Sequence, residues 1–172
     1  LMKLSLFALY CAVIFFSCNK EELKDTAQDN STTTIENWEL FWSDEFDGED
    51  LDLSKWNKLK WRPGWVNNEL QAYTDRDTNV FLEEGYLVIQ GNIEPGFSGT
   101  DYVGNDYVAD YTSGRVNTDD KFSTTYGRFD IKAKLPAGKG SWPAIWMLGE
   151  SISSIGWPQC GEIDIMEHVG YD

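Results

Sequence analysis

The sequence predicts an all-β fold in which short antiparallel strands form a sandwich or a barrel. Apolar and polar residues alternate in several short segments, as in strands that are buried on one face. Clusters of glycine and asparagine separate these segments, and no helical periodicity lies between them. With 172 residues, the chain is long enough for one domain with a hydrophobic core.

The expected strands follow from local patterns along the chain. In chain order they are 38–46, 79–82, 86–90, 112–118, 126–135, 142–148 and 161–168. The turn Glu83-Glu84-Gly85 predicts a hairpin between 79–82 and 86–90. The clearest alternation is in 126–135, where Phe129 and Ile131 share one face and polar residues the other. Residues 96–105 are rich in glycine and predict turns.

The N-terminal residues 1–18 predict an export signal. Lys3 precedes the apolar stretch 4–16, which is too short to span a bilayer but has the length of a signal-peptide core. The stretch ends at Ser17-Cys18, which resembles a bacterial lipoprotein cleavage site with Cys18 as the lipidated residue. We expect anchoring at the outer membrane or cell surface through this lipid alone. Cleavage nearby as an ordinary secretory peptide is the alternative.

The polar residues 19–35 predict a flexible linker, so we expect the folded domain over 36–172. The chain has 14 Lys and Arg against 29 Asp and Glu, and its net charge of -15 argues against nucleic acid as a partner. Aromatic residues make up 15%, which is more than a core of this size usually needs. Flat, neutral, hydroxyl-rich carbohydrates suit such side chains.

The acidic segment 161–168 is the most informative part of the chain. In a strand, Glu162 and Asp164 share one face while Ile163 and Ile165 face the core. Strict alternation would send Glu167 to the core face, where an isolated carboxylate is costly. A β-bulge at about Ile165 or Met166 would return it to the other two acids. The segment therefore predicts three carboxylates in a row on one face.

Carboxylates placed in this way suit a retaining glycosidase. Such an enzyme needs one carboxylate to attack the anomeric carbon and a second, about 5 to 5.5 Å away, to protonate the leaving oxygen. The spacing alone leaves two alternatives open, which are a calcium site built from acids and a solvated acidic strand.

The segment 142–148 predicts an aromatic surface. Trp142 and Trp146 share one face, and the apolar Ile145 and Met147 share the other. Two outward tryptophans would form a platform for sugar rings, although a loop could cover either one. Hydroxyl-binding candidates elsewhere, which could also cap turns, are Arg128, Asn68 and Glu69.

The segment Glu162-Ile163-Asp164-Ile165-Met166-Glu167 resembles the active-site signature of glycoside hydrolase family 16, in the bulged form of its laminarinases and related β-glucanases. Further matching segments are 42–46, 67–71, 126–128, 142–148 and 156–158. The resemblance covers roughly 38–172. Because catalytic domains of this family continue well past the signature, the resemblance implies that 36–172 is the N-terminal, incomplete part of such a domain.

The resemblance implies a concanavalin A-like β-jelly roll of two antiparallel sheets with an open cleft on the concave sheet. It implies internal cleavage of β-1,3 or β-1,3-1,4 glucan with retention at the anomeric carbon. Glu162 would be the nucleophile, Glu167 the general acid/base, and Asp164 a hydrogen-bonding partner of the nucleophile. The expected sugar-binding residues are Trp142, Trp146, Arg128, Asn68 and Glu69.

By the same resemblance, a structural calcium is possible with Glu45 among its ligands. We also expect that catalysis needs no cofactor and that the protein is a monomer.

Two other classes of function compete with this interpretation. A non-catalytic carbohydrate-binding domain would keep the tryptophans but would not need three aligned acids. A calcium-binding adhesion domain would place its acids in loops. Within family 16, agarases, carrageenases, lichenases and transglycosylases share the fold and the signature. Asn68-Glu69-Leu70 and the bulged signature favour a laminarinase.

Overall fold

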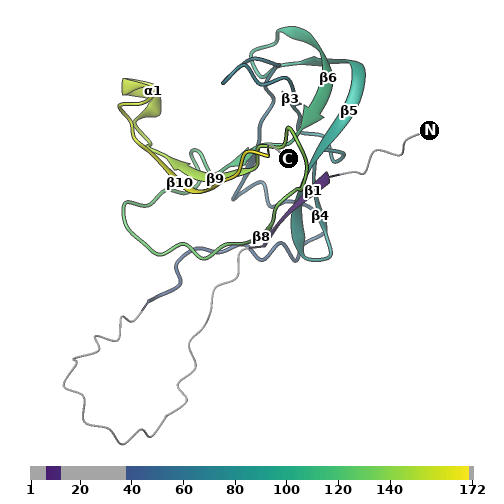
Figure 1. Cartoon of the computed structure of the whole chain (residues 1–172). Coiled ribbons are helices and arrows are strands. Elements are labelled where there is room, and N and C mark those ends of the chain that lie inside the picture. The colour runs from purple at the N-terminus through teal and green to yellow at the C-terminus, as the bar shows by residue number, and fades with distance from the viewer. Residues whose placement is uncertain (1–6, 13–37, 171–172) are drawn as a thin grey trace, which may run out of the picture.

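The computed structural model of the chain describes residues 7–12 and 38–170. Its strands, in chain order, are β1 (Phe7–Ala12), β2 (Asn57–Lys58), β3 (Ala72–Tyr73), β4 (Val80–Glu83), β5 (Tyr86–Thr100), β6 (Asp106–Ser113), β7 (Val116–Asn117), β8 (Lys132–Lys134), β9 (Ala144–Leu148) and β10 (Glu162–Glu167). One short helix, α1 (Ile152–Ile155), joins β9 to β10 (Figure 1). Within the described ranges, no helix has the length and apolar character needed to cross a bilayer. The prediction of an all-β fold is confirmed.

The largest sheet has six strands, in the order β3-β6-β5-β1-β8 with β4 also pairing with β5. Two smaller sheets join β9 to β10 and β2 to β7. All strand pairs are antiparallel apart from β3 and β6, where Ala72 lies opposite Thr112 and Tyr73 opposite Ser113 in parallel. The purely antiparallel prediction is wrong at this pair. The β4–β5 hairpin lies between β3 and β6 in the chain and supplies the long crossover that a parallel pair needs.

The hairpin predicted around Glu83-Glu84-Gly85 is confirmed. Glu84 and Gly85 have φ angles of 51° and 77°, as a tight two-residue hairpin turn requires. Strand β5 then continues to Thr100, so the turns predicted from residue 96 are wrong over 96–100. At Gly96, with φ 76°, the β5–β6 register shifts, and the Gly96 N–H donates to Asp110 Oδ1 at 3.0 Å. This irregularity allows pairing with β6 to resume beyond the glycine.

Two predicted strands are absent or shortened. Residues 38–46 form no regular strand, and of 126–135 only Lys132–Lys134 do so. A strand exists only where a neighbour completes its ladder, and β8 finds that neighbour in β1. The segments 112–118, 142–148 and 161–168 do contain strands, as predicted.

The hydrophobic core lies between the β4–β5 hairpin and residues 46–51. Phe46, Leu51, Val80 and Leu87 form a buried cluster. Partly buried side chains pack against it, namely Trp56, Leu82, Ile89, Val116 and Ile131. The core therefore belongs to the large sheet. Figure 1 shows the long β5–β6 hairpin curling away at one end and the β9–β10 hairpin on the other side.

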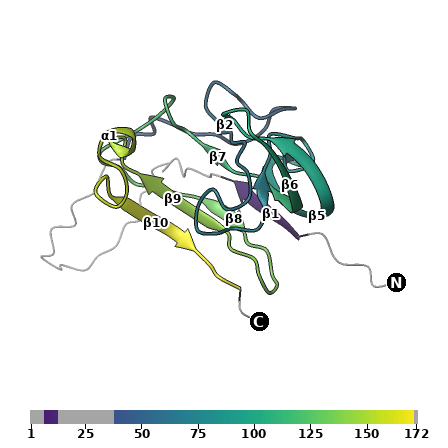
Figure 2. The same cartoon turned by 90° about the horizontal axis from the view of Figure 1, so that it is seen from above.

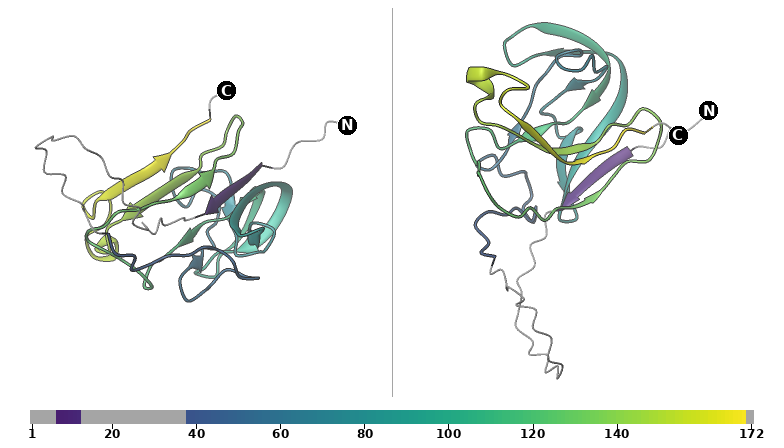
Figure 3. Two further views of the ribbon diagram at one scale, coloured as in Figure 1. Left: turned by 90° about the horizontal axis from the view of Figure 1, so that it is seen from below. Right: turned by 60° about the vertical axis from the view of Figure 1, so that its left-hand side comes forward.

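Strand β1 comes from the segment expected to be an export signal. It pairs antiparallel with β5 and with β8, and Figures 2 and 3 show it between them. Residues 1–18 were expected to lie outside the fold, but 7–12 are part of the sheet. Backbone pairing of this kind is open to any apolar segment that meets strand edges. The export signal stays a prediction, and Cys18 and the 19–35 linker lie outside the described residues.

Candidate active site

The acidic strand β10 pairs with β9 and contains the predicted bulge. The paired residues are Glu162 with Leu148, Ile163 with Met147, Asp164 with Trp146, Met166 with Ile145 and Glu167 with Ala144. The register shifts between Asp164 and Met166, so Ile165 is the extra residue. Because directly opposed residues of an antiparallel pair share a face, Glu162, Asp164 and Glu167 lie on the same face as Trp146. The predicted row of three carboxylates is confirmed.

The opposite face of β10 differs from the prediction. Ile163 and Ile165 were expected in the core, yet they are 61% and 40% exposed. Among the described residues, β10 has one partner strand, β9, and no packed layer covers Ile163. The alternation is as predicted, but the burial expected from it is not.

Beyond the end of β10, backbone hydrogen bonds keep its chain beside the segment that precedes β9. The His168 N–H donates to the Pro143 carbonyl at 3.0 Å, and the Gly170 N–H donates to the Ser141 carbonyl at 2.9 Å. Trp142 therefore lies beside Glu167, and its indole N–H donates to Glu167 Oε1 at 2.8 Å. The Trp142 side chain is half exposed. It remains accessible to a ligand while it contacts the second glutamate.

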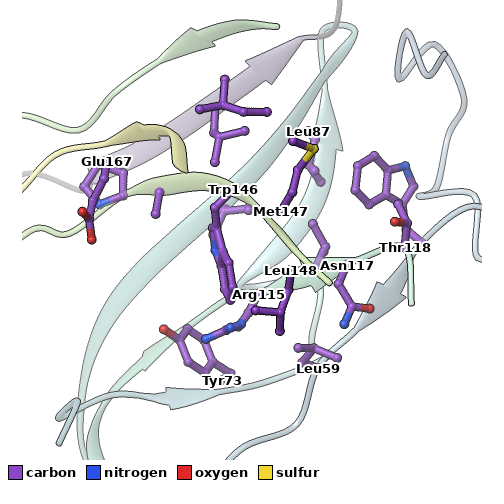
Figure 4. Close-up of a pocket in the computed structure, with 18 of the residues that line it drawn as sticks. Leu59, Tyr73, Leu87, Arg115, Asn117, Thr118, Trp146, Met147, Leu148 and Glu167 are labelled. Carbon is purple, nitrogen blue, oxygen red and sulfur yellow. The ribbon is translucent and has the colours of Figure 1, made fainter. Parts of the chain in front are cut away.

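The second tryptophan is held by a cation. The guanidinium carbon of Arg115, between β6 and β7, lies 4.9 Å from the centre of the Trp146 ring, 4.3 Å from that of Trp61 and 5.6 Å from that of Tyr73. Figure 4 shows Trp146, Arg115 and Tyr73 one above another. Such cation–π contacts favour fixed ring positions. Sequence reasoning missed Arg115 and Tyr73, because four separate chain segments meet here and no local pattern predicts that meeting.

A polar network continues from this stack to Glu69. The Gln71 amide donates to Glu69 Oε2 at 3.2 Å and to the Tyr73 hydroxyl at 3.0 Å. Burial raises the pKa of Tyr73 to about 12, and the negative charge and hydrogen bond of Glu69 act in the same direction. The Tyr73 hydroxyl therefore keeps its proton at neutral pH and can donate to Glu69.

The predicted loop residue Asn68 is presented by a tight turn. Asn67 and Asn68 have φ angles of 51° and 53°, in the left-handed region that asparagine tolerates better than most residues. The Gly64 N–H donates to the Glu69 carbonyl at 2.8 Å and closes the loop. Asn68 is exposed at its tip and Glu69 is partly buried at its base.

The side chain of Arg128 makes fewer contacts than those of Arg115 and Glu69. Its side chain is 54% exposed, and its Nε donates to Asp130 Oδ1 at 3.0 Å. An exposed pair of this kind stabilises the fold little, so the guanidinium can exchange Asp130 for a ligand.

One large open cavity of about 3990 Å³ is lined by the predicted catalytic and sugar-binding residues among many others. Its lining includes Glu162, Asp164, Glu167, Trp142, Trp146, Arg128, Asn68 and Glu69. The cavity reaches both faces of β9, since Met147 on the opposite face lines it with Leu87 (Figure 4). The carboxylate side is the part where charged and aromatic groups of different segments meet.

The metal prediction at Glu45 finds no support in the described part of the chain. Glu45 is exposed, and no group of three or more Asp, Glu, His or Cys side chains that could hold a metal ion exists within it. Its neighbour Asp44 is buried and accepts hydrogen bonds from Trp56 Nε1 at 2.8 Å and from the Phe46 N–H at 3.1 Å. Asp44 is therefore structural, and calcium stays a prediction.

Comparison with known proteins gives concordant matches. Residues 90–172 match the family model described as XgeA-like, catalytic GH16 domain. The β-glucanase of Rhodothermus marinus is 49% identical over 139 residues, which are 78% of this chain and 45% of that protein. Glucan endo-1,3-beta-glucosidase A1 of Niallia circulans is 44% identical over 141 residues, which are 76% of this chain and 20% of that protein.

Solved structures agree. The catalytic domain of an endo-1,3-beta-glucanase (laminarinase) from Thermotoga petrophila superposes with a TM-score of 0.69 at 48% identity, covering 80% of this chain and 54% of that one. The laminarinase catalytic domain of Thermotoga maritima superposes with a TM-score of 0.64 at 44% identity, with the same coverage. The chain thus spans less than half the length of these two curated relatives and about half of these structures. The described residues have the jelly-roll fold of the laminarinase domains, and residues 90–172 are similar in sequence to the XgeA-like catalytic domain of glycoside hydrolase family 16.

Proposed function

We propose that the protein containing this chain is an endo-acting, retaining glycoside hydrolase that cleaves β-1,3 or β-1,3-1,4 glucan such as laminarin. One observation carries the proposal. The bulge at Ile165 places Glu162, Asp164 and Glu167 on one exposed face of β10, beside Trp146. The similarity to proteins named β-glucanase and endo-1,3-beta-glucosidase supports a glucan substrate.

In the first step, a carboxylate oxygen of Glu162 attacks the anomeric carbon while the bond from that carbon to the leaving oxygen breaks. Glu167 donates its proton to the leaving oxygen, and the shortened glucan departs as an alcohol. The products are a glycosyl ester on Glu162 and a carboxylate at Glu167. Asp164 lies on the same face between them, and in its carboxylic acid form it would donate a hydrogen bond to the Glu162 carboxylate.

In the second step, the Glu167 carboxylate removes a proton from water as the water oxygen attacks the anomeric carbon. The bond to Glu162 breaks, and both carboxyl groups return to their starting forms. Two inversions at the anomeric carbon give net retention. The chemistry uses carboxylates and water, so we propose that no cofactor takes part in it. Removing divalent ions with EDTA should then leave kcat unchanged in the folded protein.

Substrate binding draws on the rest of the cavity lining. Trp142 and Trp146 offer ring faces beside the carboxylates for stacking on sugars, as aromatic side chains do in carbohydrate sites. Hydrogen bonds to hydroxyls would come from Asn68, Glu69 and Arg128, which carry the donors and acceptors that sugars need. The net charge of -15 favours a neutral polymer over an anionic one.

The test is reducing-sugar release by the full natural protein that contains this chain. The polymers are laminarin, mixed-linkage glucan, agarose and keratan sulfate, the last because a keratan-sulfate endo-1,4-beta-galactosidase of Sphingobacterium multivorum is 38% identical over 147 residues. Release from laminarin or mixed-linkage glucan that vanishes in Glu162→Gln supports the proposal. Binding without release from any polymer would contradict it and favour a carbohydrate-binding domain. Release from agarose or keratan sulfate alone would overturn the substrate class.

The two glutamates are distinguished by chemical rescue. Glu167→Ala loses the acid/base, and azide can enter the second step without base assistance. We expect azide to restore turnover with an activated aryl glycoside and to yield a glycosyl azide of retained configuration. No rescue in Glu167→Ala, or rescue in Glu162→Gln, would contradict the assignment of the roles.

We also propose that the protein is exported and anchored by a lipid on Cys18, and that it acts as a monomer. The apolar stretch before Cys18 and the polar residues after it support the anchor. Labelled palmitate should enter the wild-type protein in cells but not Cys18→Ser. Sedimentation of the detergent-solubilised protein at the mass of a dimer would contradict the monomer.

A further inference from the structure

The hydrogen bond between Trp142 and Glu167 joins a sugar-binding candidate to the proposed acid/base. The indole Nε1–H donates to Glu167 Oε1 at 2.8 Å. In the part of the chain that the structure describes, no other side chain donates a hydrogen bond to this carboxyl group. Trp146, the other tryptophan of this face, stacks on Arg115 instead.

The backbone fixes this contact. Ala144 pairs with Glu167, and Trp142 comes two residues before Ala144, so its side chain lies on the carboxylate face. The hydrogen bonds of His168 to Pro143 and of Gly170 to Ser141 keep the two segments together past the ends of the strands. These backbone hydrogen bonds therefore hold Trp142 and Glu167 side by side on one face.

An indole N–H can only donate a hydrogen bond and does not titrate at ordinary pH, so Trp142 can neither supply nor remove the catalytic proton. Oε1 can accept the hydrogen bond whether Glu167 is a carboxylate or a carboxylic acid, because it keeps lone pairs in both forms. The contact can therefore persist through both steps and restrict rotation of the carboxyl group.

We propose that Trp142 is a positioning residue that holds Glu167 Oε1, so that Oε2 carries the proton to the leaving oxygen and later accepts the proton of water. The inference rests on the proposed glycosidase function. It adds to ring stacking a role that depends on the N–H group of Trp142 rather than on its aromatic face.

This role makes the effect of Trp142 depend on the leaving group. A sugar alcohol needs the proton of Glu167 to depart, whereas 2,4-dinitrophenolate departs without one. Phe at position 142 keeps an aromatic face and lacks the N–H. We expect Trp142→Phe to lower kcat/KM for a laminari-oligosaccharide by roughly 10- to 100-fold, a fraction of what general acid catalysis contributes. With 2,4-dinitrophenyl β-laminaribioside, the rate of glycosyl-enzyme formation should change by less than about threefold.

The control is Trp146→Phe, which alters a ring on the same face and leaves the Trp142–Glu167 hydrogen bond in place. Sugar stacking contributes with either leaving group, so this variant should lower both rates by the same factor. Circular dichroism and the unfolding temperature verify that both variants are folded.

Three results would overturn the inference or the function beneath it. Equal losses on the two substrates in Trp142→Phe, with an increase in KM, would make Trp142 a stacking residue only. Unchanged activity on both substrates would mean that the hydrogen bond has no role. A wild-type protein that cleaves neither substrate would overturn the proposed function as well.

Discussion

The β4–β5 hairpin and the β9–β10 hairpin are both antiparallel pairs of strands, but their surroundings are opposite. In the β4–β5 hairpin, Val80 and Val88 are fully buried and Leu87 is 2% exposed. In the β9–β10 hairpin, all three carboxylates are exposed and Ile163 is 61% exposed. The first hairpin stabilises the domain by burial of apolar area. The second hairpin carries the three carboxylates, and the hydrogen bonds between its strands hold it in place rather than a buried core.

The acidic side chains of the two regions also differ in how many contacts they make within the protein. Beside β5, Arg76 Nη2 contacts Glu94 Oε2 at 2.5 Å, and Thr112 and the buried Asn79 complete the network. This acid is committed to its protein partners. On β10, Glu162 and Asp164 face the open cavity. The acids of this chain therefore include some, such as Glu94, that protein neighbours already satisfy, and others, such as Glu162 and Asp164, that line the cavity.

Moving one of the three acids to the opposite face of β10 should lower kcat more than any other change considered below. Deletion of Ile163 shifts Glu162 to the face opposite Asp164, because side chains alternate. We expect kcat on laminarin to fall by roughly 10³-fold or more, as for loss of a catalytic group. Deletion of Ile165 removes the bulge residue and leaves all three acids on one face, so most of the activity should remain. Equal losses of kcat in the two folded deletion variants would contradict the requirement that all three acids lie on one face.

Truncation in the core should affect stability instead. Leu87→Ala opens a cavity in the buried cluster and should lower the free energy of unfolding by about 2 to 4 kcal/mol. Ile163→Ala removes similar atoms from an exposed position and should change it by less than about 0.5 kcal/mol. Urea unfolding measures both. A larger loss in the Ile163 variant would show that β10 is packed and would remove the contrast between the hairpins.

Gly114 packs closely against the core residue Val80 and its neighbour Asn79. A Cβ atom there would lie 2.7 Å from the Asn79 carbonyl oxygen and against Val80 Cγ2. Gly114→Ala should therefore destabilise the protein by about 1 to 3 kcal/mol through overpacking. Gly127→Ala, where the nearest atoms are 3.8 Å away, is the control and should have little effect. Thermal unfolding of the two variants tests this, and equal unfolding temperatures would contradict the close packing.

The smallest effect concerns acid stability. The Arg76 hydrogen bond lowers the pKa of Glu94 from its ordinary value of 4.5, with help from Thr112 and against desolvation. The resulting stabilisation is present above pH 4.5 and is lost as the pH falls through the lower folded-state pKa. Glu94→Gln should flatten the pH dependence of unfolding below about pH 5, whereas the exposed Glu49→Gln should not. Identical pH profiles would argue against the pairing.

Local patterns predicted much of the site. The period of two and the cost of a buried carboxylate were enough to place a bulge near Ile165 and to align Glu167 with Glu162. The turn at Glu84-Gly85 was equally local. Such features depend on a few consecutive residues, which is why one sequence specifies them.

Features that need a distant partner were missed. The alternation in 126–135 is clear, yet only Lys132–Lys134 form a strand, because pairing is decided elsewhere in the chain. The contact of Arg115 with Trp146 and the extension of β5 past Gly96 depend on tertiary neighbours. The hydrogen bond from Trp142 to Glu167 required the register of β9 and β10.

The most direct test of the proposed nucleophile is to trap a glycosyl-enzyme intermediate on Glu162. A 2-deoxy-2-fluoro laminaribioside with a dinitrophenyl leaving group slows breakdown of that intermediate, so that mass spectrometry of peptic peptides can locate the sugar. We expect one sugar on the peptide containing Glu162, and no label in Glu162→Gln. A label on Glu167, or steady turnover of laminarin with no label on either glutamate, would contradict it.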